Sequence, residues 1–216
     1  NFIMASEITA EQIAEIEELV ARAQAAAKII ETYDQARVDH LCQAVCAAVY
    51  PLKVWGNLCD EAVDETRLGD KVTKRNKRNK LKLILRDCLR QPSVGIIEEN
   101  KEKGLVRYGK PVGVIGTLVP TTNPCLTPAG QIIYAIKARD VLICSPHPRA
   151  KNVTNKCIDI IREALVKEGA PADIIQGIKN PSIAMSQELM KRVNLVIATG
   201  CLLYTSPSPR DRTRSR

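Results

Sequence analysis

Long apolar runs and helical periodicities alternate in the second half of the chain. Residues 112–119 form an almost unbroken β-branched run, which is typical of a strand buried on both faces of a parallel sheet. A polar turn (121–124), a helical apolar pattern (132–136) and a second apolar run (141–144) follow it. This order predicts a βαβ unit, in which ligands bind at the carboxyl ends of the strands.

Further elements are predicted on both sides of this unit. After it we expect a helix over 153–169, a strand over 174–178, a helix from 182 to 190 and a strand over 193–198. Before it, 94–108 reads as two strands joined by a charged turn, and the preceding segment is helical, with a capping box at Thr9 and Gln12. The chain is therefore predicted to be an α/β doubly wound domain that follows a helical lead-in.

Composition adds limits on the class of protein. Only 3% of the 216 residues are aromatic, so aliphatic side chains and Ala must fill the core. No run approaches the length of a membrane span, and the start does not resemble a signal peptide. The eight Cys are scattered singly and lack zinc spacing, so we expect reduced thiols, no metal site and a cytoplasmic location.

Positive charge is concentrated in one internal segment. The net charge is +8, and much of it lies in residues 71–86 (KVTKRNKRNKLKLILR). Such a run is compatible with a nucleic-acid-binding module, which neutralising Lys74, Arg75, Lys77 and Arg78 would test. The run lacks interleaved aromatic residues, so a solvated helix face or loop is the favoured interpretation.

The two ends of the chain carry their own expectations. Met4 is the expected start, which makes the first three residues translated upstream sequence. Residues 201–211 (CLLYTSPSPRD) match, codon for codon, a common transposase sequencing adapter. The hypothesis is that 201–216 is a non-native, disordered tail; the alternative is a natural Arg-Ser-Pro-rich tail.

Polar residues follow three of the predicted strands. Asn123, after the first strand, either caps the next helix or turns the chain, or it donates its side-chain amide to a developing oxyanion. The segment 145–148 is either a stiff turn or a loop that contacts a nucleotide. Thr199-Gly200 lies where phosphate meets a helix N-terminus in dinucleotide folds, although no GxGxxG is present.

Four motifs in their order and spacing carry a family resemblance. They are VPTTNP (119–124), SPHPRAK (145–151), EGAP (168–171) and LVIATG (195–200). Because of these four motifs, residues from about 8 to 200 resemble the N-terminal part of the CoA-acylating aldehyde dehydrogenases. The resemblance implies a helical lead-in (4–92) and an incomplete Rossmann-like NAD(P)-binding domain (93–200).

The resemblance also implies an activity. Family members oxidise a short-chain aldehyde with NAD or NADP and pass the acyl group from a Cys thiolate to coenzyme A. The resemblance does not distinguish acetaldehyde, succinate semialdehyde and sulfoacetaldehyde as the substrate. The intact parent is expected to be a homo-oligomer that binds neither nucleic acid nor membrane. The alternatives are a fragment of a non-acylating aldehyde dehydrogenase, a basic nucleic-acid-binding module and an inert scaffold.

The resemblance assigns roles to individual residues. Asn123 matches the oxyanion-hole Asn, and none of the eight Cys matches the nucleophile, so the chain alone is expected to be inactive. Cys125, near Asn123, is taken as structural. The positions that match cofactor-binding segments are Thr121, Thr122, Ser145, His147, Pro148, Ala170, Pro171, Thr199 and Gly200.

Overall fold

The computed structural model describes residues 7–199 of the chain. The expectations for Met4, Gly200 and the tail 201–216 lie outside these residues. The helices are α1 (Ala10–Ile30), α2 (Gln35–Val49), α3 (Leu52–Thr66), α4 (Lys71–Asn76), α5 (Arg78–Leu89), α6 (Leu126–Ala138), α7 (Lys151–Lys167) and α8 (Ile183–Arg192). The strands are β1 (Gly95–Asn100), β2 (Leu105–Gly109), β3 (Val114–Val119), β4 (Val141–Pro146), β5 (Ile175–Gly177) and β6 (Leu195–Ala198).

A parallel sheet forms the centre of the molecule. Within the described residues its strand order is β5-β4-β3-β6, and all pairs are parallel. Every residue of β3 and β4 is buried, which confirms the prediction for 114–119 and 141–144. Val112, at the start of the predicted run, lies outside β3 and is exposed. The sheet and its connecting helices confirm the α/β fold class.

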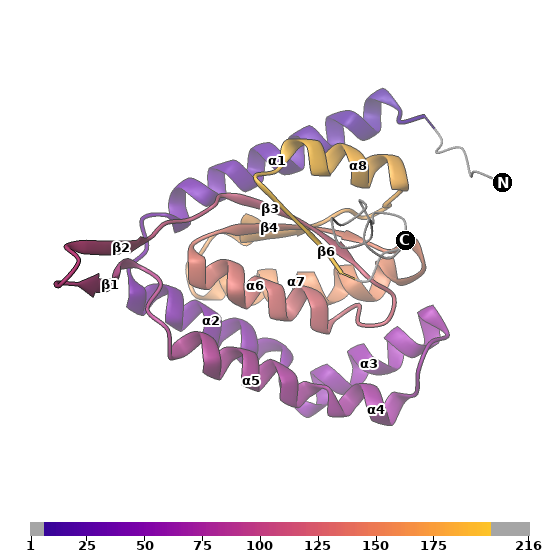
Figure 1. The fold of residues 1–216 in the computed structure, drawn as a ribbon. Coiled ribbons are helices and arrows are strands. Elements are labelled where there is room, and N and C mark those ends of the chain that lie inside the picture. Colours follow the sequence, from indigo (N-terminus) through magenta and orange to yellow (C-terminus); the bar gives the residue numbers. More distant parts are fainter. Residues whose placement is uncertain (1–6, 200–216) are drawn as a thin grey trace, which may run out of the picture.

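Helices cover both faces of the sheet (Figure 1). α6 and α7 lie on one face, while α1 and α8 lie on the other, and α2 and α5 form a further layer outside α6 and α7. The large side chains of the shared core are mostly Ile, Leu and Val, as the low aromatic content requires. The helical segment and the sheet share this core, and a division of the chain at residue 92 stays a prediction.

Side-chain caps explain where several helices begin. Thr9 and Gln12 form the predicted capping box at α1, and Ser182 accepts a hydrogen bond from the backbone of Met185 at the start of α8. Asp34 and Asp70 cap α2 and α4 in the same way. These short polar side chains satisfy amide groups that a helix leaves without partners in its first turn.

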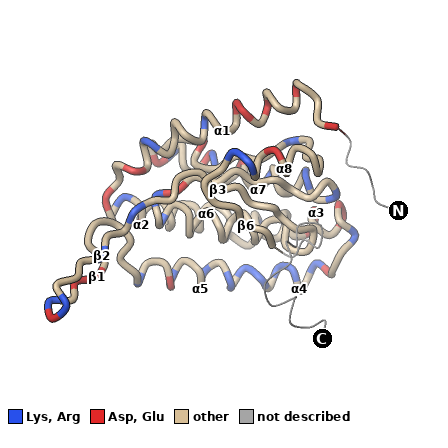
Figure 2. Tube along the Cα trace, turned by 45° about the horizontal axis from the view of Figure 1, so that its top comes forward, with Lys and Arg blue, Asp and Glu red and all other residues tan. Residues whose placement is uncertain are grey.

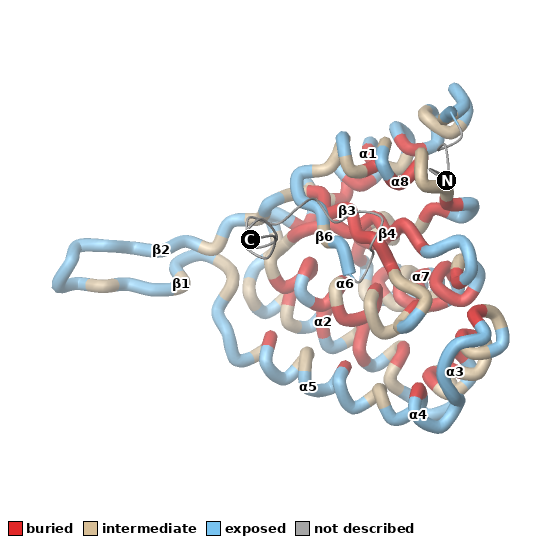
Figure 3. The backbone as a smooth tube through the Cα atoms, turned by 45° about the vertical axis from the view of Figure 1, so that its right-hand side comes forward, coloured by how far each residue is buried: buried red, intermediate tan, exposed pale blue. Residues whose placement is uncertain are grey.

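The strands β1 and β2 form an antiparallel hairpin that projects from the body (Figures 1 and 3). Their side chains are largely exposed, including Ile96, Leu105 and Tyr108. Gly104 takes a positive φ of 62° in the turn, a conformation that favours glycine. The two strands and the charged turn predicted for this segment are confirmed.

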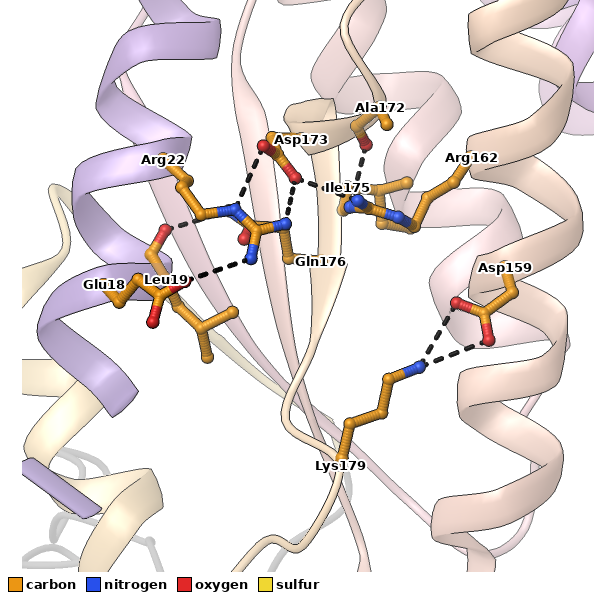
Figure 4. Close-up of polar contacts among 10 residues, drawn as sticks. All are labelled: Glu18, Leu19, Arg22, Asp159, Arg162, Ala172, Asp173, Ile175, Gln176 and Lys179. Carbon is orange, nitrogen blue, oxygen red and sulfur yellow. Dashed lines mark hydrogen bonds and ion pairs between the residues drawn. The ribbon is translucent and has the colours of Figure 1, made fainter. Parts of the chain in front are cut away.

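Asp173 joins α1, α7 and the start of β5 (Figure 4). Its carboxylate accepts two hydrogen bonds from Arg22 (3.1 and 2.6 Å) and one from Arg162 (2.9 Å). Arg162 also donates to the carbonyl oxygens of Ala172 and Ile175 at the edge of the sheet. The hydrogen bonds from Arg22, opposed by burial and reinforced by Arg162, lower the pKa of Asp173.

Asp173→Asn is expected to lower the free energy of unfolding by about 1–2 kcal/mol at neutral pH, since Arg22 is half-exposed and the charge–charge contribution is screened. A carboxyl group with a lowered folded-state pKa stabilises above its unfolded pKa, and this contribution is lost as pH falls through the folded value. Urea unfolding at several pH values should therefore show a difference that shrinks in acid. Asp159→Asn, which removes only the exposed pair with Lys179, is the control, and a pH-independent difference would contradict the assignment.

Candidate active site

Three loops leave neighbouring strands at the carboxyl edge of the sheet. The parallel register places Val119 beside Pro146 and Leu118 beside Ala198, so the segments that follow β3, β4 and β6 start next to one another. His147 confirms this proximity, because its backbone N–H donates to the Val119 carbonyl (3.0 Å). The predicted residues after these strands are thus brought to one edge.

The order of the strands reverses at this edge of the sheet. From β3 the chain passes through α6 to β4 on one side, and it returns through α8, on the opposite face, to β6 on the other side. The connections therefore diverge between β3 and β6. Open α/β sheets bind ligands at such a reversal point. Thr121, Thr122, Asn123 and Thr199 flank it.

Asn123 lies between β3 and α6 and has a specific partner. No side-chain cap is found at the start of α6, so within the described structure Asn123 contributes only its backbone carbonyl, which accepts from Thr127 (3.1 Å). Its side-chain Oδ1 instead accepts a hydrogen bond from Lys77 Nζ (2.7 Å). Helix capping therefore does not explain this side chain, while the residue does lie in the turn between β3 and α6.

Two lysines from the first half of the chain reach the turn that carries Asn123. Lys74 Nζ donates to the carbonyl oxygen of Thr122 (3.3 Å), next to the Lys77–Asn123 bond. Lys74 is only 7% exposed, and burial, together with the charge of Lys77, lowers its pKa. A cavity of about 20 Å³, lined in part by these lysines and by Asn123, lies under the turn and has room for about one water. Sequence reasoning did not identify either lysine as a site residue.

The expectation of a solvated face for residues 71–86 is correct only in part. Figure 2 shows Lys and Arg along α4 and α5, and Lys80 and Lys82 are exposed. Arg75 pairs with Asp60, while Arg78 lies over the Tyr50 ring at 4.4 Å. Lys74 and Lys77 contact the turn. All four residues on which the nucleic-acid alternative depends therefore contact groups of the protein itself.

The predicted loop 145–148 lies only in part outside the strand, because Ser145 and Pro146 are the last, buried residues of β4. Ser145 is buried, and its hydroxyl lies 2.7 Å from the hydroxyl of Ser186 in α8, so it joins the sheet to that helix. His147 and Pro148 are exposed. His147 Nδ1 accepts from the backbone of Arg149 (3.1 Å), and partial desolvation of the ring, followed by the charge of Arg149, lowers the pKa of the imidazole.

A short hydrogen-bond relay connects β3 to Thr199. Thr117, fully buried in β3, donates to Gln131 Oε1 (2.6 Å), and Gln131 Nε2 donates to the Thr199 hydroxyl (3.4 Å). Gln131 thereby orients the exposed end of β6 against α6. The sequence offered no local signal for this role, because the three residues lie on different elements.

Ala170 and Pro171 are not brought together with the other predicted cofactor residues. They follow α7 and precede β5, so they lie at the amino-terminal edge of the parallel sheet, opposite Asn123 and Thr199. Ala170 is buried. At the carboxyl edge, the segment after β5 occupies the corresponding place, and there Lys151 Nζ donates to Asn180 Oδ1 (2.9 Å).

The seven described Cys are buried free thiols. Burial raises the pKa of Cys59 to about 12 and that of Cys144 further. For Cys125, a hydrogen bond with Cys157, together with burial, raises the pKa well above its usual value. The thiolate is the reactive form, so Cys59, Cys125 and Cys144 are poor nucleophiles, in agreement with a structural role for Cys125.

Residues 7–199 contain no group of three or more His, Cys, Asp and Glu side chains arranged to hold a metal ion. Among the helices of this part of the chain, none combines the length and the apolar character needed to cross a membrane.

Comparison with known proteins identifies the family. A family model described as the aldehyde dehydrogenase family matches residues 76–202, which is more than half of the chain. The chain belongs to the aldehyde dehydrogenase family. The match covers α5, the hairpin and the whole described sheet, and it includes Asn123.

Several of the relatives that the chain resembles are named as acylating or acetylating aldehyde dehydrogenases. The chain is 44% identical over 184 residues to a sulfoacetaldehyde dehydrogenase of Acholeplasma sp, covering 84% of this chain and 38% of the relative. It is 39% identical over 188 residues to the succinate-semialdehyde dehydrogenase (acetylating) of Clostridium kluyveri, covering 86% and 41%. A solved acetylating aldehyde dehydrogenase from Geobacillus thermoglucosidasius aligns with a TM-score of 0.83 and 30% identity, covering 89% and 42%. The chain therefore spans about two fifths of the length of these relatives.

Proposed function

We propose that this chain forms the cofactor-binding side of a CoA-acylating aldehyde dehydrogenase. The proposed reaction oxidises a short-chain aldehyde with NAD or NADP and transfers the acyl group to coenzyme A. The observation that carries the proposal is Asn123: its side-chain amide lies at the carboxyl end of the central strand, does not cap α6, and is held by Lys77. The acetylating relatives support the CoA-dependent form of the reaction.

The chemistry assigns one electrostatic task to this chain. A Cys thiolate, supplied by a part of the enzyme outside this chain, forms a C–S bond to the aldehyde carbon, and the carbonyl oxygen becomes an alkoxide. Asn123 Nδ2 donates to that oxygen and stabilises its charge. The alkoxide then re-forms a carbonyl as the carbon loses a hydride, which the bound cofactor would accept, and a thioester results. The thiol of coenzyme A displaces the enzyme Cys from this thioester, which gives acyl-CoA, the free enzyme thiolate and a proton.

Some of the residues predicted to bind the cofactor are exposed at the carboxyl edge of the sheet, and others are not. NAD or NADP, when bound, supplies the carbon that accepts the hydride. Thr122, His147, Pro148 and Thr199 are exposed there and offer hydroxyl, imidazole and apolar contacts. Ser145 is turned toward Ser186, so its proposed part in binding is to position the loop rather than to touch the cofactor.

The proposal is tested with a hybrid enzyme, in which residues 10–199 replace the matching segment of the Acholeplasma relative. We expect reduction of NAD or NADP that requires both aldehyde and coenzyme A, measured by absorbance of the reduced cofactor with the unmodified relative as the control. Reduction without coenzyme A, yielding the free acid, would favour the non-acylating alternative. A folded hybrid that binds cofactor but is inactive would contradict the proposal. The 216-residue chain alone is expected to be inactive.

A further inference from the structure

The hydrogen bond between Lys77 and Asn123 selects one of two orientations of an amide. A lysine ammonium has three donors and no acceptor, so Asn123 must turn its oxygen toward it. Rotation of the amide by half a turn would place its NH₂ against the ammonium, where neither group can accept. The contact therefore directs Nδ2 away from Lys77.

We propose that Lys77 is a positioning residue for the oxyanion-stabilising amide of Asn123. Its ammonium fixes Oδ1, so that Nδ2 can donate one of its N–H groups to the reacting oxygen, and its charge polarises the amide and strengthens donation by Nδ2. The catalytic meaning of this role rests on the proposed function. The orientation of the amide can be tested without it.

The charges around Lys77 support this assignment. In the same helical segment Lys71 and Arg75 pair with Asp64 and Asp60. Among the described residues, Lys77 and Lys74 form no ion pair with a carboxylate, and their ammonium groups donate only to oxygens of the turn. A buried lysine such as Lys74 is usually paired, so two positive charges directed at neutral amide oxygens call for an explanation other than charge neutralisation.

Lys74 and Lys77 act on adjacent residues of the turn. Lys74 holds the carbonyl of Thr122 by a main-chain contact, and Lys77 holds the side chain of Asn123. Both ammonium groups contribute positive potential next to Nδ2, where the alkoxide charge would develop. A purely structural role, in which Lys77 only fastens the turn to α4 and α5, predicts a loss of stability but no specific loss of turnover.

The first experiment observes the side-chain NH₂ of Asn123 in the 216-residue chain by heteronuclear NMR, with the signal assigned by its disappearance in Asn123→Asp. A hydrogen bond to Oδ1 increases the double-bond character of the amide C–N bond and slows its rotation. Lys77→Met is expected to shift the amide signal and to speed exchange between the two protons. Lys77→Arg, which retains a charged donor, is expected to preserve both. An unchanged signal in folded Lys77→Met would overturn the inference.

The second experiment measures turnover in the hybrid enzyme. We expect Lys77→Met to lower kcat by about 10- to 100-fold with a much smaller change in KM for the aldehyde, because misplacement of a catalytic donor affects the transition state most. Lys77→Arg should recover most of the activity. In an Asn123→Ala background Lys77→Met should have little further effect, since its action passes through Asn123.

The outcomes separate the inference from the proposed function. An inactive unmodified hybrid counts against the function, while the NMR result still reports on the amide. An active hybrid in which Lys77→Met retains normal kcat overturns the positioning role. Equal, additive losses from Lys77→Met and Asn123→Ala also overturn it, because they show that the lysine acts independently of the amide.

Discussion

Asn123→Ala is expected to lower kcat of the hybrid enzyme by about 10²- to 10³-fold, with a much smaller change in KM for the aldehyde. The amide donates to an oxygen that is charged after thiolate attack and only weakly polarised before it. Its removal therefore raises the energy of the transition state more than that of the bound aldehyde. Steady-state rates at saturating coenzyme A and cofactor measure this difference.

Asn79→Ala is the matched control for this substitution. Asn79 is an exposed residue of α5, a few positions from Lys77, and makes no side-chain hydrogen bond within the described part of the chain. Its replacement should leave kcat unchanged. A similar small effect for Asn123→Ala and Asn79→Ala would remove Asn123 from the catalytic machinery, and a loss confined to KM would assign it to substrate binding.

Local patterns were sufficient to predict the part of the site that lies on the sheet. The apolar runs of β3 and β4 end abruptly in polar segments, and the carboxyl ends of parallel strands share one edge. Asn123 and His147 could therefore be placed together without coordinates. The same logic located the end of β6, since a strand that alternates with helices joins the same sheet in parallel.

Contacts between distant segments could not be predicted in this way. Lys74 and Lys77 lie 48 and 46 residues before their partners, on helices that reach the turn only through tertiary packing. In the sequence they are two members of a basic run, with nothing to distinguish them from exposed Lys80 and Lys82. Whether a charge is solvated or directed inward depends on the surface that its helix packs against.

The edge of the sheet on which a loop lies follows from the direction of the neighbouring strands, and this direction has to be considered for every loop. EGAP follows a helix and precedes β5, so the parallel sheet places Ala170 and Pro171 at the amino-terminal edge. Ser145 illustrates a second limit: the sequence predicts a loop there, but β4 continues through Pro146, and the Ser145 hydroxyl faces Ser186 across the sheet–helix interface. The position of a residue at the end of a strand does not show whether its side chain contacts a cofactor or packs in the core.

The helical segment that precedes the sheet is expected to be energetically inseparable from it. α1 packs on the face that α8 also covers, while α2 packs against α6 and α7. Gln176 in β5 donates to the carbonyl of Leu19 in α1 (2.9 Å), which ties the edge strand to the first helix. The sheet that carries Asn123 is thus supported by residues well before the predicted βαβ unit.

Ile143→Ala is expected to lower the free energy of unfolding by about 3 kcal/mol, within the range of about 2–5 kcal/mol for removal of a fully buried aliphatic side chain. Ile143 is fully buried in β4 between Gly116 of β3 and Gln176 of β5, so the sheet leaves a cavity where the side chain was. Ile143→Val should cost only about 1 kcal/mol, because most of the volume remains filled. Urea unfolding followed by circular dichroism gives both values.

The same substitution at Ile96 isolates the contribution of burial. Ile96 is also in a strand but is 56% exposed on the hairpin, so Ile96→Ala is expected to change stability by less than about 0.5 kcal/mol. Comparable losses at Ile96 and Ile143 would mean that the hairpin is covered in solution. A small loss at Ile143 would mean that β4 is not packed on both faces. Since the loops after β3 and β4 inherit their positions from these two strands, that result would also undermine the geometry on which the roles of Asn123 and Lys77 depend.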